Sequence, residues 1–259
     1  MATLRVHDLT EYWKKTDLMV KPASYPMAAG YDVPSVDTIH RPLTLDLSEV
    51  CHEDRVYWAV RRAQDILLSS LALVALSPLL LVTYAAIGID SPGASPIFTQ
   101  QRVGRNGKLF KMYKFRTMCP DAEQKLKDLM DHNEKDGPVF KMKNDPRITR
   151  VGKFLRKTSI DELPQLFNIL KGDMSLVGPR PERPFFVEKF REEIPRYMIK
   201  HQVRPGMTGW AQVNGYRGDT SIRKRIEHDL YYIENWTLGL DIKILFLTVF
   251  KGFINKNAY

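Results

Sequence analysis

Cysteine is scarce in this 259-residue chain: Cys51 and Cys119 are the two copies, and they lie far apart. Two isolated thiols give neither a disulfide framework nor a metal-ligand spacing, so a disulfide-stapled domain and a zinc site are excluded. This cysteine usage is typical of a reducing compartment. Internal repeats are absent, and because residues 1–15 are polar we expect no signal peptide.

Acidic residues are also in deficit. The chain has 30 Asp and Glu against 39 Lys and Arg, which gives a formal net charge of +9 and a pI near 9.4. A balance of this kind indicates anionic partners, namely nucleic acid, anionic lipid or phosphorylated substrates.

Residues 1–54 mix charge with Pro and Gly and show no sustained hydrophobic period. Their turn-forming residues are typical of loops, and we predict an extended N-terminal arm without assignable chemistry. The predicted organisation is therefore an arm over 1–54, a membrane helix hairpin over 55–90 and a cytoplasmic catalytic domain over 91–259.

A long hydrophobic run is the clearest single signal. Ile66 to Ile89 contains 24 consecutive uncharged residues, bounded by Asp65 and Asp90. A straight helix of that length measures roughly 36 Å, which exceeds a hydrocarbon thickness of about 30 Å. The run therefore predicts a membrane helix rather than a buried soluble helix.

Two features favour a bent anchor over a simple span. Ser77-Pro78 falls at the midpoint, where proline removes a backbone hydrogen bond and kinks a helix. Both flanks are basic, which draws both ends towards the cytoplasmic side. We predict a re-entrant hairpin broken at Ser77-Pro78, in which the hydroxyl of Ser77, Ser69 or Ser70 satisfies the freed carbonyl groups. An ordinary single span is the alternative.

Residues 91–259 predict a small α+β domain, mostly helical with short strands. Arg105 to Lys108 is typical of a tight turn between alternating segments and predicts a basic β-hairpin. Val139 to Met142 and Met174 to Val177 predict two further strands, and a Gly-rich loop follows over 203–217. The predicted helices span 121–134, 150–156, 184–201 with a break near Pro195, 221–236 and 238–253. We expect 238–253 to be an amphipathic helix at the membrane interface, whereas 184–201 fits either an interface or a soluble core.

The most informative stretch is 158–183, which places the adjacent carboxylates Asp161 and Glu162 at the start of a short helix. Either Ser159 or Asp161 caps this helix, and the second register is favoured because it puts Pro164 in the first turn. In both registers the carboxylates lie at the positive end of the helix dipole, which favours their ionised form and attracts phosphate.

Five short motifs occur in one order: KFRTM at 114–118, NDPR at 144–147, DELPQ at 161–165, GPRP at 178–181 and RPGMTGW at 204–210. Together with Ser77-Pro78 they resemble the monotopic phosphoglycosyl transferases, also called bacterial sugar transferases. One such block is a weak signal, whereas five in order are specific. The resemblance covers roughly residue 55 to the C-terminus.

The resemblance implies transfer of a hexose-1-phosphate from a UDP-sugar to undecaprenyl phosphate, with release of UMP. It implies a covalent phosphosugar intermediate on Asp161, a need for Mg²⁺, and a re-entrant helix broken at Ser77-Pro78. The enzyme would lie at the cytoplasmic face of the inner membrane, where its lipid-diphosphate-sugar product starts a surface glycan such as exopolysaccharide, O-antigen or capsule. Segments 138–141 and 210–215 look closest to longer members, which favours glucose or galactose.

The residues themselves suit phosphoryl transfer, which needs a nucleophile, a metal and cations on the phosphate oxygens. Asp161 fits the nucleophile because a carboxylate forms an acyl phosphate, and Glu162 with Asp161 fits a Mg²⁺ site. Arg180, fixed between two prolines, is suited to bidentate phosphate binding. The further candidates for phosphate binding are Lys114, Arg116, Arg147 and Arg156.

Two other interpretations stay open. One is a membrane-tethered basic scaffold that binds anionic lipid or nucleic acid, and it leaves the pairing of Asp161-Glu162 with Arg180 without a reason. The other is a one-step transferase in which Asp161 acts as general base. Under the favoured interpretation the partners are a UDP-sugar, undecaprenyl phosphate and membrane lipids; a homodimer is compatible and no nucleic acid is expected.

Overall fold

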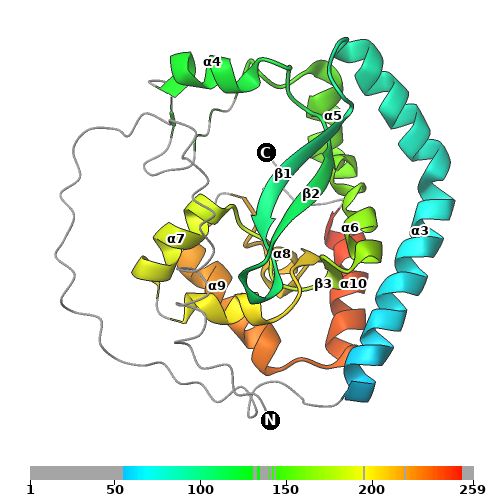
Figure 1. The fold of residues 1–259 in the computed structure, drawn as a ribbon, viewed down its shortest axis with the longest axis vertical. Coiled ribbons are helices and arrows are strands. Elements are labelled where there is room, and N and C mark those ends of the chain that lie inside the picture. The colour runs from blue at the N-terminus through cyan, green and yellow to red at the C-terminus, as the bar shows by residue number, and fades with distance from the viewer. Residues whose placement is uncertain are drawn as a thin grey trace. The chain divides into compact units, whose positions relative to one another are not determined.

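The computed structural model describes residues 55–130, 133–134, 140, 142, 144–194, 196–218 and 220–252. The predicted arm over 1–54, and all of the predicted strand near 139–142 except Phe140 and Met142, lie outside the described residues. The described chain is mostly helical and contains two small sheets of two strands each (Figure 1). This confirms the predicted class of a mostly helical α+β domain with short strands.

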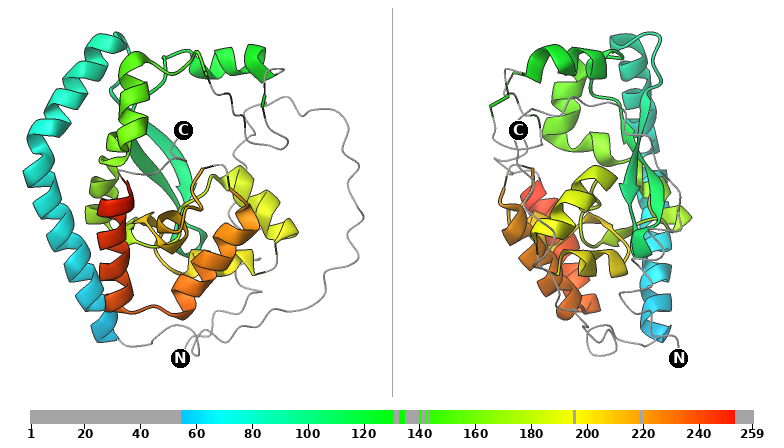
Figure 2. Two further views of the ribbon diagram at one scale, coloured as in Figure 1. Left: turned by 180° about the vertical axis from the view of Figure 1, so that it is seen from behind. Right: turned by 60° about the vertical axis from the view of Figure 1, so that its left-hand side comes forward.

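Helix α3 (Arg55–Asp90) contains the predicted hydrophobic run and continues through Pro78. Pro78 has no N–H for the carbonyl of Val74, and the Ser77 hydroxyl donates a hydrogen bond to that carbonyl at 2.8 Å, which is the role predicted for it. Helix α3 is bowed, with its concave side towards the rest of the described chain (Figures 1 and 2). It is thus bent rather than divided into two antiparallel arms, and re-entry into a membrane stays a prediction.

Both ends of α3 are attached to the same structural unit, His52–Tyr259. Near its start, the Arg62 guanidinium donates to the carbonyl groups of Ile169 and Leu170 at 2.6 and 2.7 Å. At its end, Asp90 accepts a hydrogen bond from the amide of Val151 at 3.3 Å. Polar contacts therefore fix the two ends of the helix to one folded body.

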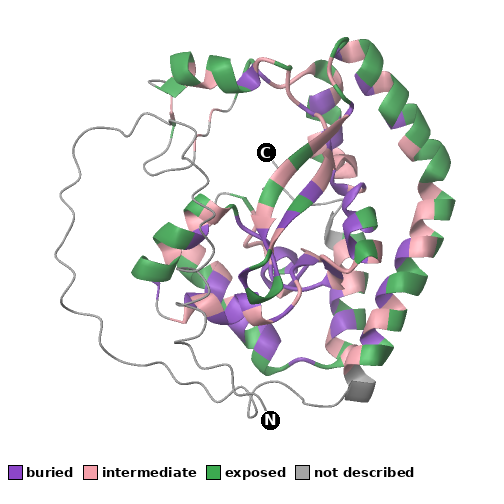
Figure 3. Ribbon diagram, viewed as in Figure 1, coloured by how far each residue is buried: buried purple, intermediate pink, exposed green. Residues whose placement is uncertain are grey.

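Between these ends α3 exposes its apolar side chains. Leu71, Val74, Leu81 and Val82 are between 58% and 74% exposed, and Figure 3 shows the outer side of the helix largely in the exposed colour. The segment Trp58–Asp90 is long and apolar enough to cross a membrane, and 11% of its most hydrophobic window is buried. That burial does not fit a core helix of a soluble protein.

The predicted hairpin is confirmed. Strands β1 (Ile97–Val103) and β2 (Leu109–Phe115) pair antiparallel around the short helix η1 (Arg105–Gly107). Asn106 and Gly107 adopt positive φ angles of 55° and 75°, as the tight turn requires. Phe110 and Met112 of β2 pack against helix α6 (Gln165–Lys171), which fixes the hairpin on that helix.

A second sheet joins β3 (Ser175–Val177) in parallel to β4 (Gly206–Thr208). Strand β3 lies within the predicted strand, whereas β4 falls in what the sequence indicates as a Gly-rich loop. A Cβ atom on Gly206 would lie 2.1 Å from the backbone nitrogen of Gly178, so glycine is what allows these two segments to approach. A strand of three residues is too short for its sequence to show the alternation of polar and apolar residues that predicts a strand.

The remaining helices are close to the prediction. Helix α4 ends at Leu129, well short of the predicted residue 134. Asp121 lies at its N-cap position, but its side chain makes no capping hydrogen bond and instead forms an ion pair with Lys125 at 2.9 Å. The predicted break near Pro195 separates α7 from η4. The elements not yet bounded are α4 (Ala122–Leu129), α5 (Arg150–Thr158), α7 (Pro184–Glu193), η4 (Tyr197–Gln202), α8 (Trp210–Val213), α9 (Ile222–Glu234) and α10 (Leu238–Gly252).

Candidate active site

The adjacent carboxylates lie in a one-turn 3-10 helix, η3 (Ile160–Glu162), that joins α5 to α6. Ser159 takes a left-handed conformation with φ 58° between α5 and η3, and its carbonyl accepts from the Glu162 amide at 3.2 Å. Helix α6 starts only after Pro164. The favoured register is therefore wrong, because Asp161 lies inside η3 and caps no helix. Ser159 occupies the N-cap position of η3, as in the other register, but its side chain makes no capping hydrogen bond.

Glu162 is buried among three cations. Its carboxylate accepts from the Lys114 ammonium at 3.0 Å and from Arg180 at 2.7 Å, and Arg217 lies 3.4 Å away. Burial alone would raise the pKa of Glu162, but the positive charges of Arg180, Lys114 and Arg217 hold that pKa well below its ordinary value. Glu162 is therefore ionised throughout the physiological pH range.

Asp161, next in the chain, has the opposite electrostatic character. Burial and then the negative charge of Glu162 raise the pKa of Asp161 above its ordinary value, and the charges of Lys114, Arg156 and Arg217 oppose that rise. The expectation that a helix dipole favours the ionised form of both carboxylates is therefore wrong for Asp161. Two neighbouring carboxyl groups whose pKa values are driven apart are typical of a catalytic pair with divided roles.

Asn168 fixes the strand that carries Lys114. Its side-chain oxygen accepts from the Tyr113 amide at 2.9 Å, and its side-chain nitrogen donates to the Lys111 carbonyl at 2.7 Å. Asn168 is fully buried on α6, the helix that follows Glu162. One amide side chain thus sets the position of Lys114 relative to the carboxylate with which it pairs.

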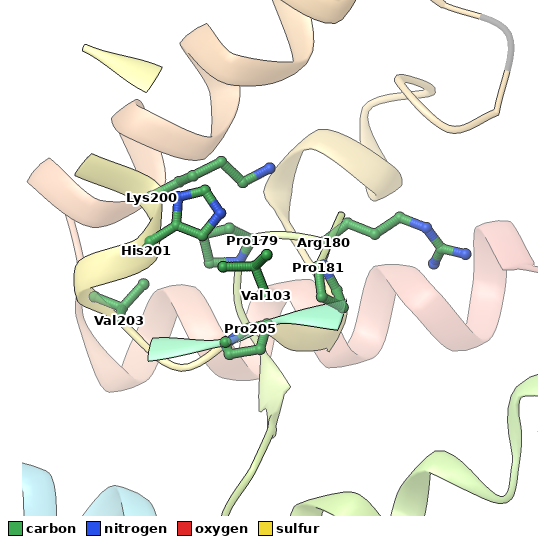
Figure 4. Close-up of a pocket in the computed structure, with 9 residues that line it drawn as sticks. Val103, Pro179, Arg180, Pro181, Lys200, His201, Val203 and Pro205 are labelled. Carbon is green, nitrogen blue, oxygen red and sulfur yellow. The ribbon is translucent and has the colours of Figure 1, made fainter. Parts of the chain in front are cut away.

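Arg180 follows β3 within the motif GPRP. Behind this turn lies a small cavity lined by Pro179, Pro181, Lys200 and His201, and Figure 4 shows the Arg180 guanidinium pointing away from Lys200 and His201. Burial lowers the pKa of His201 to about 3, with Lys200 adding to the effect, so the imidazole is neutral. The cavity therefore lies behind the turn that carries Arg180, whereas the guanidinium of Arg180 extends to the carboxylate of Glu162.

Arg217 belongs to this cluster although it is absent from the predicted site residues. It lies beyond α8, and besides approaching Glu162 it donates to the Ser159 hydroxyl at 3.1 Å. The Gly-rich composition of the preceding loop indicates a segment that faces a ligand. No sequence pattern distinguishes Arg217 from the other polar residues of that loop.

The other predicted phosphate-binding residues have different surroundings. Arg156 donates to the Thr117 hydroxyl at 2.9 Å and acts electrostatically on Asp161. Arg147 is buried and forms an ion pair with Asp145 at 2.6 Å. The Arg116 guanidinium donates a hydrogen bond to the carbonyl of Ser95 and lies over the ring of Phe98. Within the described chain, Lys114, Arg180 and Arg156 thus join the carboxylates, whereas Arg147 and Arg116 contact other groups.

The carboxylate pair fits a magnesium ion in part. Mg²⁺ in phosphoryl-transfer sites takes one or two protein carboxylates together with water and substrate phosphate oxygens. Asp161 can supply one such carboxylate, whereas Glu162 would have to give up a contact with a cation. No cluster of three or more metal-ligating side chains occurs among the residues that the structure describes. The predicted participation of both residues in a metal site stays a prediction.

The fold and the site define a class of protein: a domain carried on a long apolar helix, with a carboxylate pair held among cations. The chain belongs to the bacterial sugar transferase family, whose model matches residues 56–255. This confirms the resemblance drawn from the five motifs.

Three relatives illustrate the family's range. The chain is 50% identical over 203 residues to a "UDP-glucose:undecaprenyl-phosphate glucose-1-phosphate transferase" of Klebsiella pneumoniae, covering 77% of this chain and 41% of that protein. It is 49% identical to a "UDP-N-acetylgalactosamine-undecaprenyl-phosphate N-acetylgalactosaminephosphotransferase" of Aeromonas hydrophila, with 75% and 44% covered. It is 47% identical to an "Undecaprenyl-phosphate galactose phosphotransferase" of Salmonella typhimurium, with 77% and 42% covered. The chain thus spans less than half the length of these relatives.

Proposed function

We propose that this chain transfers a sugar-1-phosphate from a UDP-sugar to undecaprenyl phosphate. The observation that carries the proposal is the arrangement of Lys114, Arg180 and Arg217 around Glu162, next to an Asp161 of raised pKa. Family membership supplies the substrate class, since the relatives are named for undecaprenyl phosphate and for sugar phosphates. A lipid-binding scaffold would not need a carboxylate of raised pKa in such a cluster.

The proposed reaction has two displacements at phosphorus. A carboxylate oxygen of Asp161 attacks the phosphorus that bears the sugar, and the bond from that phosphorus to the UMP oxygen breaks, so UMP leaves. An oxygen of undecaprenyl phosphate then attacks the same phosphorus, and the bond to Asp161 breaks. The carboxylate is regenerated and the product is a lipid-diphosphate-sugar.

Glu162 organises the cations that this reaction needs. It stays ionised and holds Lys114 and Arg180 in place before the substrate binds. With Arg156 and Arg217, four cations face two carboxylates, and the positive excess suits a diphosphate. Preorganised positive charge of this kind stabilises the charge on the phosphoryl oxygens as the bonds exchange.

The burial that raises the pKa of Asp161 also makes its carboxylate a better nucleophile once ionised, because water solvates it less. We assign Asp161 as the side chain that would share Mg²⁺ with the substrate phosphates. Bound there, the ion would shield the negative charges of nucleophile and substrate from each other. The chain supplies part of this shielding itself, because the positive charges of Lys114, Arg156 and Arg217 act on Asp161.

For the location we propose a monotopic attachment at the cytoplasmic face of the inner membrane, with α3 re-entrant. Attachment of both helix ends to one body supports it, because a straight span would put those ends on opposite faces. Helix α10 adds an apolar stripe that is more than half exposed, at Ile242, Phe246, Val249 and Phe250, as expected of an interfacial helix. The lipid phosphate and the cytosolic nucleotide sugar meet at this surface.

The proposal is tested by UMP release from a panel of UDP-sugars with undecaprenyl phosphate in lipid nanodiscs. We expect release with at least one UDP-hexose, and the panel is needed because the named relatives differ in their sugar. Asp161→Asn should lose release, whereas Glu234→Gln, which removes an exposed ion pair with Arg196, should retain it. Full release by Asp161→Asn would contradict the assignment.

A further inference from the structure

The free edge of strand β3 is covered by side chains of α3. Strand β3 pairs with β4 along one edge, and the described chain places no strand on the other. There, Asp65 accepts from the Leu176 amide at 2.9 Å and from the Ser175 hydroxyl at 3.0 Å. The Arg61 guanidinium donates to the Val177 carbonyl and to the Ser175 hydroxyl. Two side chains of the membrane helix thus take the place of a third strand.

Asp65 and Arg61 are both buried, and Arg61 has further partners. Both are at most 5% exposed, although they lie in the segment with the hydropathy of a membrane span. The Arg61 guanidinium stacks 3.7 Å from the centre of the Trp236 ring, donates to the Tyr232 hydroxyl at 2.9 Å and lies 3.5 Å from Asp241. Buried charges need such partners, and these partners fix the orientation of Arg61.

The backbone after β3 leaves little room for adjustment. A Cβ atom on Gly178 would lie 2.6 Å from the Arg204 carbonyl, and one on Gly209 would lie 2.3 Å from the Gly178 carbonyl. Two residues further on, Arg180 is fixed between prolines and contacts Glu162 at 2.7 Å. In packing this close, a displacement of β3 is passed on to Arg180.

We propose that Asp65 and Arg61 are positioning residues, which set the place of Arg180 against Glu162 through strand β3. The membrane helix then completes the catalytic centre as well as attaching the protein to the bilayer. The inference rests on the proposed function for its kinetic consequence, whereas its structural consequence is measurable without any reaction.

The structural test is hydrogen–deuterium exchange of the full-length protein in nanodiscs. Asp65→Asn keeps an oxygen that accepts from the Leu176 amide, whereas Asp65→Leu has none. We expect faster exchange in the segment 174–182 for Asp65→Leu and wild-type exchange for Asp65→Asn. Val187→Ala, a buried change in α7, is the control for general loss of stability and should leave that segment unchanged. Unchanged exchange of 174–182 in Asp65→Leu would overturn the proposal.

The kinetic test combines each variant with Arg180→Lys and measures kcat and KM for UMP release. We expect Asp65→Leu to lower kcat about tenfold in the wild-type background and far less with Arg180→Lys, as for coupled residues. Asp65→Asn should restore most of kcat. A loss that is the same in both backgrounds would show a merely structural role and overturn the proposal.

Two safeguards keep the outcomes separable. Ser175→Ala removes the hydroxyl contacts with Asp65 and Arg61 and leaves the bond between Asp65 and the Leu176 amide, so it carries the same test at smaller amplitude if Asp65→Leu does not fold. A wild-type protein that releases no UMP would contradict the proposed function, and the exchange experiment would still decide the positioning role.

Discussion

Neutral substitutions at the two adjacent carboxylates should differ in their effect on the stability of the protein, because the fold favours the charge of one and disfavours the charge of the other. Glu162→Gln removes a charge that the fold stabilises, because Lys114 and Arg180 donate to it and hold its pKa low. Asp161→Asn removes a charge that the fold disfavours, because burial and Glu162 raise the pKa of Asp161. The first variant should be less stable than wild type at pH 7, and the second should be equally or more stable.

The size of the first effect follows from the contacts of Glu162. A hydrogen bond to a charged group contributes about 1.5–3 kcal/mol and one between neutral groups about 0.5–1.5, so each loses about 1 kcal/mol in Glu162→Gln. Two of the contacts are short, at 3.0 Å to Lys114 and 2.7 Å to Arg180, whereas Arg217 at 3.4 Å adds little. The total is about 2 kcal/mol, which corresponds to a fall in Tm of about 4–8 °C for a domain of this size.

The pH dependence of stability independently checks the sign of each variant's change in the free energy of unfolding. The contribution of Glu162 is present above its ordinary pKa of 4.5 and is lost as the pH falls towards its lower folded value, so the deficit of Glu162→Gln should shrink on acidification. The contribution of Asp161 is present below its ordinary pKa of 3.8 and is lost as the pH rises through its higher folded value.

Thermal unfolding of both variants and wild type in one detergent, at several pH values, measures these shifts. A wild-type Tm for Glu162→Gln at pH 7 together with a lowered Tm for Asp161→Asn would refute the assignment of charge states.

Three further predictions follow from single features. The rate of UMP release should fall as the pH drops through the raised pKa of Asp161, so its acidic limb lies above 3.8; a limb at or below that value would contradict the burial argument. Gly152→Ala should destabilise the protein by at least about 1–3 kcal/mol, because its Cβ would lie 2.1 Å from the Thr117 carbonyl, whereas Gly88→Ala, with nothing within 4 Å, is the control for thermal unfolding. Phe246→Asp should weaken flotation with liposomes at an unchanged Tm, because Phe246 is 61% exposed on α10; unchanged flotation would remove α10 from the membrane interface.

Local patterns predict much of this fold. The hydrophobic run, the Asn-Gly turn and the prolines locate α3, the hairpin and the break after α7, because each feature acts within a few residues. Strand β4 is not predictable in this way, since it depends on the clearance between Gly206 and Gly178 across a long stretch of chain. The start of α6 is not predictable in this way either, because the carboxylates form a 3-10 turn of their own and α6 begins only after Pro164.

The candidate site also combines residues that local motifs predict with residues that only the folded chain brings together. The motifs indicate Lys114, Glu162 and Arg180, and the fold brings these three together. Arg217 joins them only through the path of a loop that no local spacing records. Arg147 illustrates the converse: its motif supplies its own counter-ion, Asp145, two residues earlier, so its charge is used within the motif.

The proposed two-step reaction requires a covalent bond between Asp161 and a sugar phosphate. The decisive measurement is the mass of the intact protein, and then of the peptide containing residue 161, after incubation with a reactive UDP-sugar in the absence of undecaprenyl phosphate. We expect a gain of one sugar phosphate on Asp161, which undecaprenyl phosphate removes and Asp161→Asn never shows. UMP release with acceptor present, but no adduct on rapid quenching at any time, would contradict the two-step reaction and favour Asp161 as a general base.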